Sequence, residues 1–324
     1  MPLVSIIVPI YNVAKYIEKC TRSLFEQTFD DIEYIFVNDC TPDDSMDILL
    51  QIINEYPDKR DKCKIINHDK NKGLTFARNS GLSVASGKYI IHCDSDDWME
   101  KDMISSMYEL AEAENADIVT CDFRMIYQDS TVDSYSIDWG KNKILSLQKY
   151  IANTWTVLWN LLVKRDIYLK YNIRSLAVAA NFCEDFNLSV KLLLHANKVV
   201  HLKKVLYNYN RLNLSSILHN NKKIMHDEQI MYLDVLRYMK KMGEYQYYEK
   251  QICWRILRSK QEWVLNKSTY KDFLNLYPES HKYILSCPFL NIKLKIMMWC
   301  LVHHISFISQ LMLFIRYLKH KVIF

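Results

Sequence analysis

The stretch that decides the fold is residues 89–97, which read Tyr-Ile-Ile-His-Cys-Asp-Ser-Asp-Asp. It is a short apolar run that ends in a cluster of acidic residues. Similar apolar runs precede it at Leu3–Val8, Ile32–Val37 and Lys64–Asn67, and segments with helical spacing of apolar residues separate them. Apolar strands that alternate with helices are typical of a parallel sheet buried on both faces. The sequence therefore predicts an α/β fold.

Polar residues follow each of the four predicted strands. Ligands of α/β sheets bind beyond the carboxyl ends of the strands, so these segments are expected to line one shared crevice. The four segments are Pro9–Asn12, Asn38–Ser45, Asn67–Arg78 and Asp94–Asp97.

Further elements are predicted after residue 116. We expect strands at Asp117–Phe123, Thr131–Trp139, Leu161–Lys164 and Lys198–Tyr209, and helices at Leu147–Asn153, Arg165–Tyr171, Phe186–His195 and within 220–267.

The composition and charge exclude several classes of protein. Half of the 324 residues are hydrophobic and 24% are charged, which argues against a disordered or collagen-like chain. The net charge of +5 is local. Six basic residues and no acidic residue follow Glu279, whereas residues 1–279 sum to −1. A near-neutral body gives no case for a nucleic-acid partner, whereas a basic apolar end indicates a membrane surface.

The cysteines and the N-terminus indicate a cytoplasmic protein. The nine cysteines are odd in number and contain no C-x-x-C pair, so neither a disulfide framework nor a zinc site is expected. The first residues carry no basic segment and lead directly into an apolar run. We expect a first strand there and no signal peptide.

The acidic strand end at Asp94 and Asp96 predicts a metal-nucleotide site. The crevice contains neither G-x-G-x-x-G nor a P-loop motif, so phosphates must be held in another way. Mg²⁺ and Mn²⁺ bind through one or two carboxylates together with phosphate oxygens. The alternative role for such a tripeptide is to cap the next helix.

Several other residues have two possible roles. Asp39 directly follows a strand and either accepts the N–H of a pyrimidine base or caps the following helix, whereas Asp43 and Asp44 suit the first turn of that helix. Arg78 either returns toward the crevice or is an exposed helical arginine. Trp155 and Trp159 either stack on acceptor sugar rings or pack in the core.

The ordered motifs resemble those of family 2 glycosyltransferases of the GT-A fold. The resemblance is strong over residues 3–97 and weaker through Trp159-Asn160, Glu184-Asp185 and Tyr207-x-Tyr209-x-Arg211-x-x-x-Ser215. At Cys40-Thr41-Pro42 the chain departs from the Gly-Ser-Thr often present in relatives. The matching motifs are Pro9-x-Tyr11-Asn12, Val37-Asn38-Asp39-x-x-x-Asp43-x-Ser45, Asn71-x-Gly73-x-x-x-Ala77-Arg78-Asn79-x-Gly81 and Asp94-Ser95-Asp96-Asp97.

This resemblance implies a Rossmann-like, mainly parallel sheet flanked by helices, with a helical C-terminal extension. Residues 1–97 would form the nucleotide-sugar-binding half and 98–219 the acceptor-binding half of the catalytic domain. Residues 220–324 would form a helical region with a basic apolar tail that associates with membranes.

The resemblance also implies roles for individual residues. Asp185 would be the catalytic base, and Asp96 and Asp94 would hold Mn²⁺ or Mg²⁺. Such chemistry needs a carboxylate to activate the acceptor hydroxyl and a cation to stabilise the leaving diphosphate. Glu184 either supports the base or caps its helix. The nucleotide-sugar-binding residues would be Pro9, Tyr11, Asn12, Asp39, Arg78, Asp94, Ser95 and Arg211.

We therefore expect an inverting, metal-dependent glycosyltransferase. The resemblance favours a UDP-sugar donor and a glycan or lipid-linked oligosaccharide acceptor. A sugar-nucleotide pyrophosphorylase would need a Gly-rich basic loop after the first strand, and Pro9–Lys15 contains no glycine. A non-catalytic scaffold of a membrane polysaccharide complex would have lost an aspartate of the D-x-D motif or the base, and all of them are present.

The tail predicts peripheral attachment to the inner face of the cell membrane. Ile296–Ile315 is a run of twenty residues without Lys, Arg, Asp or Glu, which is long enough to span a bilayer. However, His303, Ser306 and Gln310 fall on one helical stripe, and polar groups in hydrocarbon are costly. A helix that lies in the interface is expected, and a helix pair that closes the core is the alternative.

Overall fold

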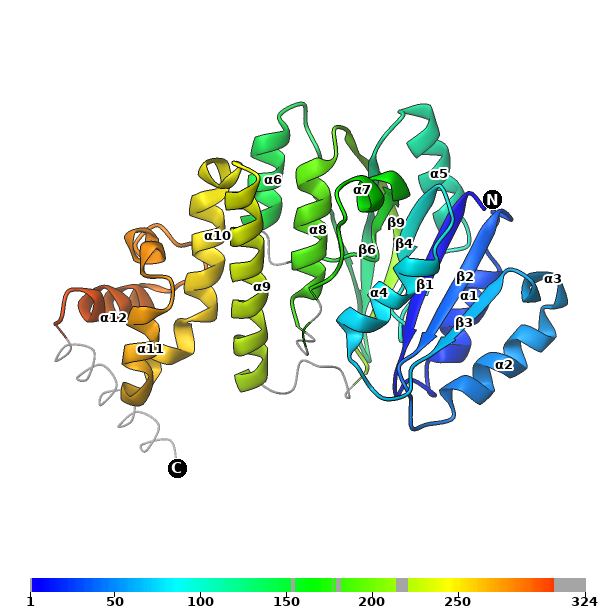
Figure 1. Ribbon diagram of the computed structural model, residues 1–324, viewed down its shortest axis with the longest axis horizontal. Coiled ribbons are helices and arrows are strands. Elements are labelled where there is room, and N and C mark those ends of the chain that lie inside the picture. Colours follow the sequence, from blue (N-terminus) through cyan, green and yellow to red (C-terminus); the bar gives the residue numbers. More distant parts are fainter. Residues whose placement is uncertain (1, 153–154, 177, 179–181, 214–220, 306–324) are drawn as a thin grey trace. The chain divides into compact units, whose positions relative to one another are not determined.

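The structure is a computed structural model that describes residues 2–152, 155–176, 178, 182–213 and 221–305 (Figure 1). The chain divides into two compact units. The first comprises residues 1–147 and 155–220, and the second comprises residues 148–154 and 221–324.

The N-terminal part of the first unit is a parallel sheet with intervening helices, which confirms the predicted α/β fold. Its strands lie in the order β3-β2-β1-β4, and every residue of β1 is buried, as its continuous apolar sequence requires. The elements are β1 (Val4–Ile10), α1 (Ile17–Phe25), β2 (Ile32–Asn38), α2 (Ser45–Glu55), α3 (Pro57–Arg60), β3 (Cys63–Asn67), α4 (Leu74–Val84) and β4 (Tyr89–His92).

The rest of the sheet is mixed. β8 pairs antiparallel with β4 and β6, β6 pairs parallel with β9, and β9 pairs antiparallel with β5, while β7 extends the sheet from β6. The elements are β5 (Trp98–Met99), α5 (Met103–Ala113), β6 (Ile118–Ile126), β7 (Thr131–Ser134), α6 (Lys143–Ala152), β8 (Leu161–Lys164), α7 (Arg165–Lys170), α8 (Glu184–His195) and β9 (Val199–Asn210). The predicted strand Thr131–Trp139 was too long, because β7 ends at Ser134.

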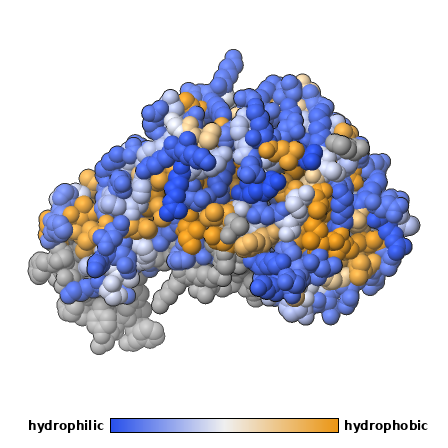
Figure 2. All heavy atoms as spheres, in the orientation of Figure 1, coloured by the Kyte–Doolittle hydropathy of each residue, from blue (hydrophilic) through white to orange (hydrophobic). Residues whose placement is uncertain are grey.

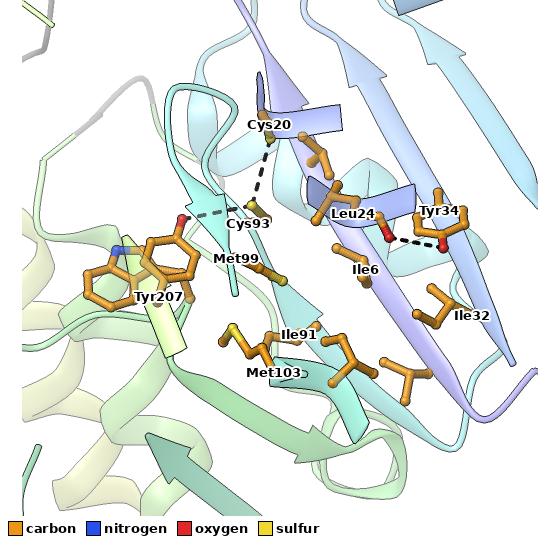
Figure 3. Close-up of a cluster of buried hydrophobic side chains, with 14 of the residues drawn as sticks. Ile6, Cys20, Leu24, Ile32, Tyr34, Ile91, Cys93, Met99, Met103 and Tyr207 are labelled. Carbon is orange, nitrogen blue, oxygen red and sulfur yellow. Dashed lines mark hydrogen bonds between the residues drawn. The ribbon is translucent and has the colours of Figure 1, made fainter. Parts of the chain in front are cut away.

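Helices pack on both faces of the parallel strands. On one face, α1, α2 and α5 form the main hydrophobic cluster with alternate residues of β1, including Ile6 and Val8. Figure 3 shows part of this cluster, with Leu24 beside Ile6. The opposite face of β1 carries Ile7, and α4 lies so close to it that a Cβ added to Gly81 would come within 2.5 Å of Ile7 Cγ2. Glycine therefore lets α4 reach the sheet.

The second unit is helical in its described part. Its core contains Leu257, Val264, Phe273, Ile284 and Met298. The elements, besides the last residues of α6, are α9 (Asn221–Lys241), α10 (Tyr245–Ser259), α11 (Tyr270–Asn275) and α12 (Ile292–Val302), with short 3₁₀ turns η2 (Gln261–Leu265), η3 (Lys267–Thr269) and η4 (Pro278–Tyr283).

The last described helix differs from the predicted tail helix. The expected run Ile296–Ile315 is not one helix, because α12 begins at Ile292 and ends at Val302. His304 adopts a left-handed conformation with φ 59°, and the N–H of Ile305 donates to the carbonyl of Cys300. This arrangement terminates helices. Among the described residues, no helix is long and apolar enough to cross a membrane, and residues 306–324 lie outside them.

Candidate active site

The carboxyl ends of three adjacent parallel strands carry most of the predicted site. In the pairing of β1 with β2, Ile10 lies opposite Asn38, and in the pairing of β1 with β4, Ile7 lies opposite His92. Tyr11, Asp39 and Asp94 each follow one of these strand ends. The parallel register therefore brings the segments that follow β1, β2 and β4 to one edge of the sheet.

Asp39 anchors the loop that precedes α4. Its carboxylate accepts the backbone N–H groups of Lys72, at 2.8 Å, and of Gly73, at 2.7 Å, and lies 2.6 Å from His68 Nδ1. Gly73 has φ 95°, a conformation that favours glycine. A carboxylate oxygen has two lone pairs, so Oδ2, which accepts from Gly73, retains capacity for a ligand donor. The sequence did not reveal this anchoring role.

The turn after β2 holds the loop after β1. The Thr41 hydroxyl accepts the N–H of Asn12 at 2.8 Å and donates to Asp43 at 2.6 Å. Cys40 adopts φ 56°, a left-handed conformation that favours glycine, so the chain makes this turn without a glycine. The Asp43 carboxylate also accepts from Ser45, the first residue of α2, so its predicted place at the helix start is only part of its role.

Arg78 is the centre of a buried cluster of charges. The side chain is 1% exposed and donates through Nη2 to Asp94 at 2.8 Å and through Nη1 to Glu184 at 3.1 Å. Nη1 also donates to Asp185. Arg78 is therefore not an exposed helical arginine. It links α4 to the end of β4 and to the first turn of α8.

The acidic residues around Arg78 outnumber its single positive charge. Burial by itself lowers the pKa of Arg78, but the charges of Asp185, Asp94 and Glu184 raise it. Burial raises the pKa of Asp94 to about 6 against the opposing effect of Arg78. Burial and the neighbouring Asp185 raise the pKa of Glu184 well above its usual value. The raised pKa therefore favours the protonated form of Glu184. The excess of acidic groups would also favour the binding of a further positive charge.

The end of β9 positions the remaining acids of the motif. Asp96 accepts from the Asn213 amide at 2.8 Å, and burial raises the pKa of Asp96. Asp97 is buried and accepts the Tyr207 hydroxyl at 2.8 Å and the N–H of Asn210 at 2.7 Å. The Tyr207 hydroxyl also accepts the N–H of Asp94 at 3.1 Å. The sequence analysis gave Asp97 no role and missed Asn210 and Asn213, because their contacts depend on how β9 lies beside the motif.

The aromatic residues of this region belong mostly to the core. The Trp159 indole is buried and stacks on Tyr207, with ring centroids 4.2 Å apart and planes 7° apart. Figure 3 shows Tyr207 close to Cys93, at the edge of the main hydrophobic cluster. Trp155 is half-buried and meets the edges of Phe123 and Tyr209 at 5.8 and 6.0 Å. Trp159 is therefore a packing residue, and Trp155 is the better placed of the two for an acceptor.

The other predicted site residues differ in their environments. Pro9 and Ser95 are buried, whereas Tyr11 and Asn12 are exposed at the sheet edge. Arg211 is exposed and contacts Tyr209, with Nη1 3.4 Å from the hydroxyl, and in the described part of the chain it forms no ion pair with Asp94 or Asp96. Ser215 lies outside the described residues.

The predicted metal ligands are two carboxylates. The residues that the structure describes contain no group of three or more His, Cys, Asp or Glu side chains that could hold a metal ion. Mg²⁺ commonly binds through one or two carboxylates together with water and substrate phosphate oxygens, and Asp94 and Asp96 are of that ligand type.

Comparison with known proteins identifies the class. The model of glycosyl transferase family 2 matches residues 5–183. The uncharacterized glycosyltransferase EpsJ of Bacillus subtilis (strain 168) is 34% identical over 257 residues, which cover 76% of this chain and 71% of the relative. The chain therefore belongs to glycosyl transferase family 2, and it is a glycosyltransferase.

Solved structures share the fold. Residues 1–349 of S. aureus TarS, in complex with UDP-GlcNAc, superpose with a TM-score of 0.69 at 19% identity, covering 98% of this chain and 92% of that one. The mannosyltransferase PcManGT from Pyrobaculum calidifontis, in complex with GDP-Man and Mn²⁺, gives a TM-score of 0.55 at 14% identity, covering 93% of this chain and 86% of that one. These similarities confirm the Rossmann-like GT-A fold.

Proposed function

We propose that this chain is an inverting glycosyltransferase that moves a sugar from a nucleotide-sugar donor, a UDP-sugar, to a hydroxyl of a glycan or lipid-linked oligosaccharide. The observation that carries this proposal is the Arg78 cluster. It joins Asp94, at the end of β4, to Asp185, at the start of α8. The leaving diphosphate beside Asp94 and the base Asp185 would then lie next to each other.

The donor would lie along the edge formed by the ends of β1, β2 and β4. Exposed Tyr11 offers a ring for the nucleotide base, and Asp39 Oδ2 offers an acceptor for its N–H. The UDP-GlcNAc bound by TarS supports a uridine donor for this fold. The nucleotide would also lie against Pro9, Asn12 and Ser95 at this edge of the sheet.

A divalent cation fits the donor set at the D-x-D motif. Asp94 and Asp96 would hold it, and when bound it supplies positive charge to the departing diphosphate. Each carboxylate makes a side-chain hydrogen bond through one oxygen, Asp94 to Arg78 and Asp96 to Asn213. The Mn²⁺ bound by PcManGT supports metal use in this fold. Arg211 would reach the diphosphate from the loop after β9.

Asp185 would act as the base and Glu184 as its support. The Asp185 side chain is 19% exposed and can meet a substrate hydroxyl, whereas Glu184 is 6% exposed and enclosed. The Asp185 carboxylate would take the proton of the acceptor hydroxyl while that oxygen forms a bond to the anomeric carbon. The bond from the anomeric carbon to the diphosphate breaks, and the nucleotide leaves with the electron pair. Attack opposite the leaving group inverts the configuration.

We also propose a division of labour along the chain. Residues 1–97 would bind the nucleotide sugar, residues 98–219 the acceptor, and residues 220–324 a membrane surface. The enzyme would then work peripherally at the inner face of the cell membrane, close to a lipid-linked acceptor. The basic sequence after Glu279 supports this placement.

A screen of nucleotide sugars with and without Mn²⁺ tests the proposal. We expect thermal stabilisation and slow hydrolysis with a UDP-sugar, both dependent on the metal. Proton NMR of a transferred product should show the anomeric configuration opposite to that of the donor. If none of the nucleotide sugars stabilises the protein, the donor proposal is refuted. If the product keeps the anomeric configuration of the donor, inversion is refuted.

A further inference from the structure

One face of α12 is exposed and apolar. Ile292, Ile296 and Trp299 are 68%, 40% and 40% exposed, and their spacing of four and three residues puts them on one stripe. The opposite side of the helix is buried in the core of the second unit through Met297, Met298, Cys300 and Leu301. The helix therefore presents a hydrophobic stripe to solvent while its other side anchors it.

The stripe is preformed, because both ends of α12 are fixed. At the start, the Asn291 side chain accepts the N–H of Leu294 at 3.0 Å. At the end, the N–H groups of His304 and Ile305 donate to the carbonyls of Leu301 and Cys300, at 3.1 and 2.7 Å. These bonds satisfy backbone groups that helix ends otherwise leave without partners. Binding at this face would need no new helix to form.

The charged residues of α12 itself are lysines. Lys293 is exposed and Lys295 is partly exposed, and no acidic residue follows Glu279 in the sequence. Figure 2 shows hydrophobic residues at the surface of the C-terminal helices, bordered by hydrophilic ones. Single exposed apolar residues are ordinary on proteins. A stripe that contains Trp and is flanked by lysines is typical of helices that lie in a membrane interface.

We propose that the face formed by Ile292, Ile296, Trp299 and Lys293, hereafter the α12 face, docks on an anionic lipid bilayer. The helix has eleven residues and a length of about 16 Å, so it would lie along the surface and not cross it. The stripe is small for a stable protein interface, which buries roughly 1,200 Å² or more in total. The positive charges of Lys293 and Lys295 on the helix itself match anionic headgroups.

The α12 face gives the proposed membrane attachment a defined site within the described residues. This proposal rests on the proposed function in one respect only: docking would bring the enzyme to a lipid-linked acceptor. Lipid binding itself is independent of catalysis and is measured without substrate.

Vesicle flotation of the full chain tests the proposal. The vesicles contain phosphatidylcholine alone or phosphatidylcholine with an equal part of phosphatidylglycerol. We expect flotation with the anionic vesicles only, and a loss of about ten-fold or more in binding for the double variant Ile296→Glu, Trp299→Glu. Lys293→Gln should lower binding to the anionic vesicles about five-fold at low salt. Leu50→Glu is the matched control, because Leu50 of α2 is 46% exposed and lies in the first unit.

The double variant must keep its thermal unfolding temperature, which is expected because both side chains are exposed. Equal flotation of the double variant and the wild type would overturn the proposal, as would equal binding to neutral vesicles. If the wild type does not float but forms dimers, and the double variant does not form them, the face binds a second copy of the chain. Metal-dependent binding of the nucleotide sugar should be unchanged in the variant, so failure of the catalytic proposal is seen separately.

Discussion

Arg78 Nη2 donates to Asp94 Oδ1 across 2.8 Å, and this bond ties the helix after β3 to the acidic end of β4. The same guanidinium bonds Glu184 and Asp185, which lie more than one hundred residues further along the chain. One buried cation thus holds three acidic side chains from two distant parts of the sequence.

The first prediction concerns the loss of Arg78. Arg78→Met should lower the free energy of unfolding by about 3–5 kcal/mol at pH 7, because it leaves buried carboxylates without their cation. The loss should shrink toward pH 5, since the pKa values of Asp94 and Glu184 are already raised and protonation removes their charge. Urea unfolding of the variant and the wild type at pH 7 and pH 5 measures this difference in the free energy of unfolding.

Arg22→Met is the control for Arg78. Arg22 pairs with Glu18 and Glu55 on the surface, so its loss should cost about 1 kcal/mol or less. Equal losses for the two variants, or a loss at Arg78 that does not change with pH, would contradict the role of Arg78 as a buried counter-ion.

The second prediction concerns the metal. Asp96→Ala should abolish metal-dependent UDP binding while the fold persists, because Asp96 lies at a strand end and adds little to the core. Calorimetric titration with UDP, with and without Mn²⁺, measures the effect. Asp44→Ala is the control, since Asp44 precedes α2 without a capping hydrogen bond from its side chain. Unchanged Mn²⁺-dependent affinity in folded Asp96→Ala would exclude Asp96 as a ligand.

The third prediction separates the two acids of α8. Asp185→Asn should lower kcat by about 10²–10⁴-fold and leave donor affinity nearly intact, because a general base acts in the transition state. Glu184→Gln should lower kcat much less, since the raised pKa of Glu184 favours its neutral form, which glutamine mimics. If Glu184→Gln proves the more damaging change in steady-state assays, the base is Glu184.

The fourth prediction concerns the contact between β9 and the acidic motif. Tyr207→Phe removes a hydroxyl that bonds both Asp97 and the backbone of Asp94, so it should cost about 1–3 kcal/mol in the free energy of unfolding. Tyr209→Phe removes only a 3.4 Å contact with Arg211 and should cost less. Chemical denaturation compares the two. Similar costs would show that the Tyr207 hydroxyl does not hold the motif.

The fifth prediction is a pH dependence of the second unit. Burial lowers the pKa of Lys260 to about 7, and its ammonium group reaches the carbonyl of Leu276 at 2.5 Å and His281 at 3.0 Å. Between pH 7 and 10 the unfolded chain binds a proton that the folded chain does not. The contribution of Lys260 to stability should therefore rise with pH there, by at most about 1.4 kcal/mol per unit. Unfolding by urea at several pH values measures the slope.

Lys260→Met should remove this rise, because methionine keeps the apolar stem without a titratable group. A slope that is the same in the variant and the wild type would assign the pH dependence to other residues.

Local sequence was sufficient to predict the first half of the fold. The apolar runs that became β1 and β2 are buried on both faces, so their hydrophobicity needs no partner to be recognised. The polar ends of these strands indicated the crevice, because parallel strands always meet at one edge. The family followed from the order of the motifs.

Only the tertiary structure decided how distant residues meet. Arg78 reaches Glu184 and Asp185 because α4 and α8 converge on the end of β4, and no periodicity in the sequence encodes that approach. The pairing of β9 with β5 brought Tyr207 to Asp97 in the same way. The end of α12 at Val302 was hidden because an apolar run does not reveal the left-handed turn at His304. Sequence patterns report local conformation and burial, whereas contacts between charges depend on long-range packing.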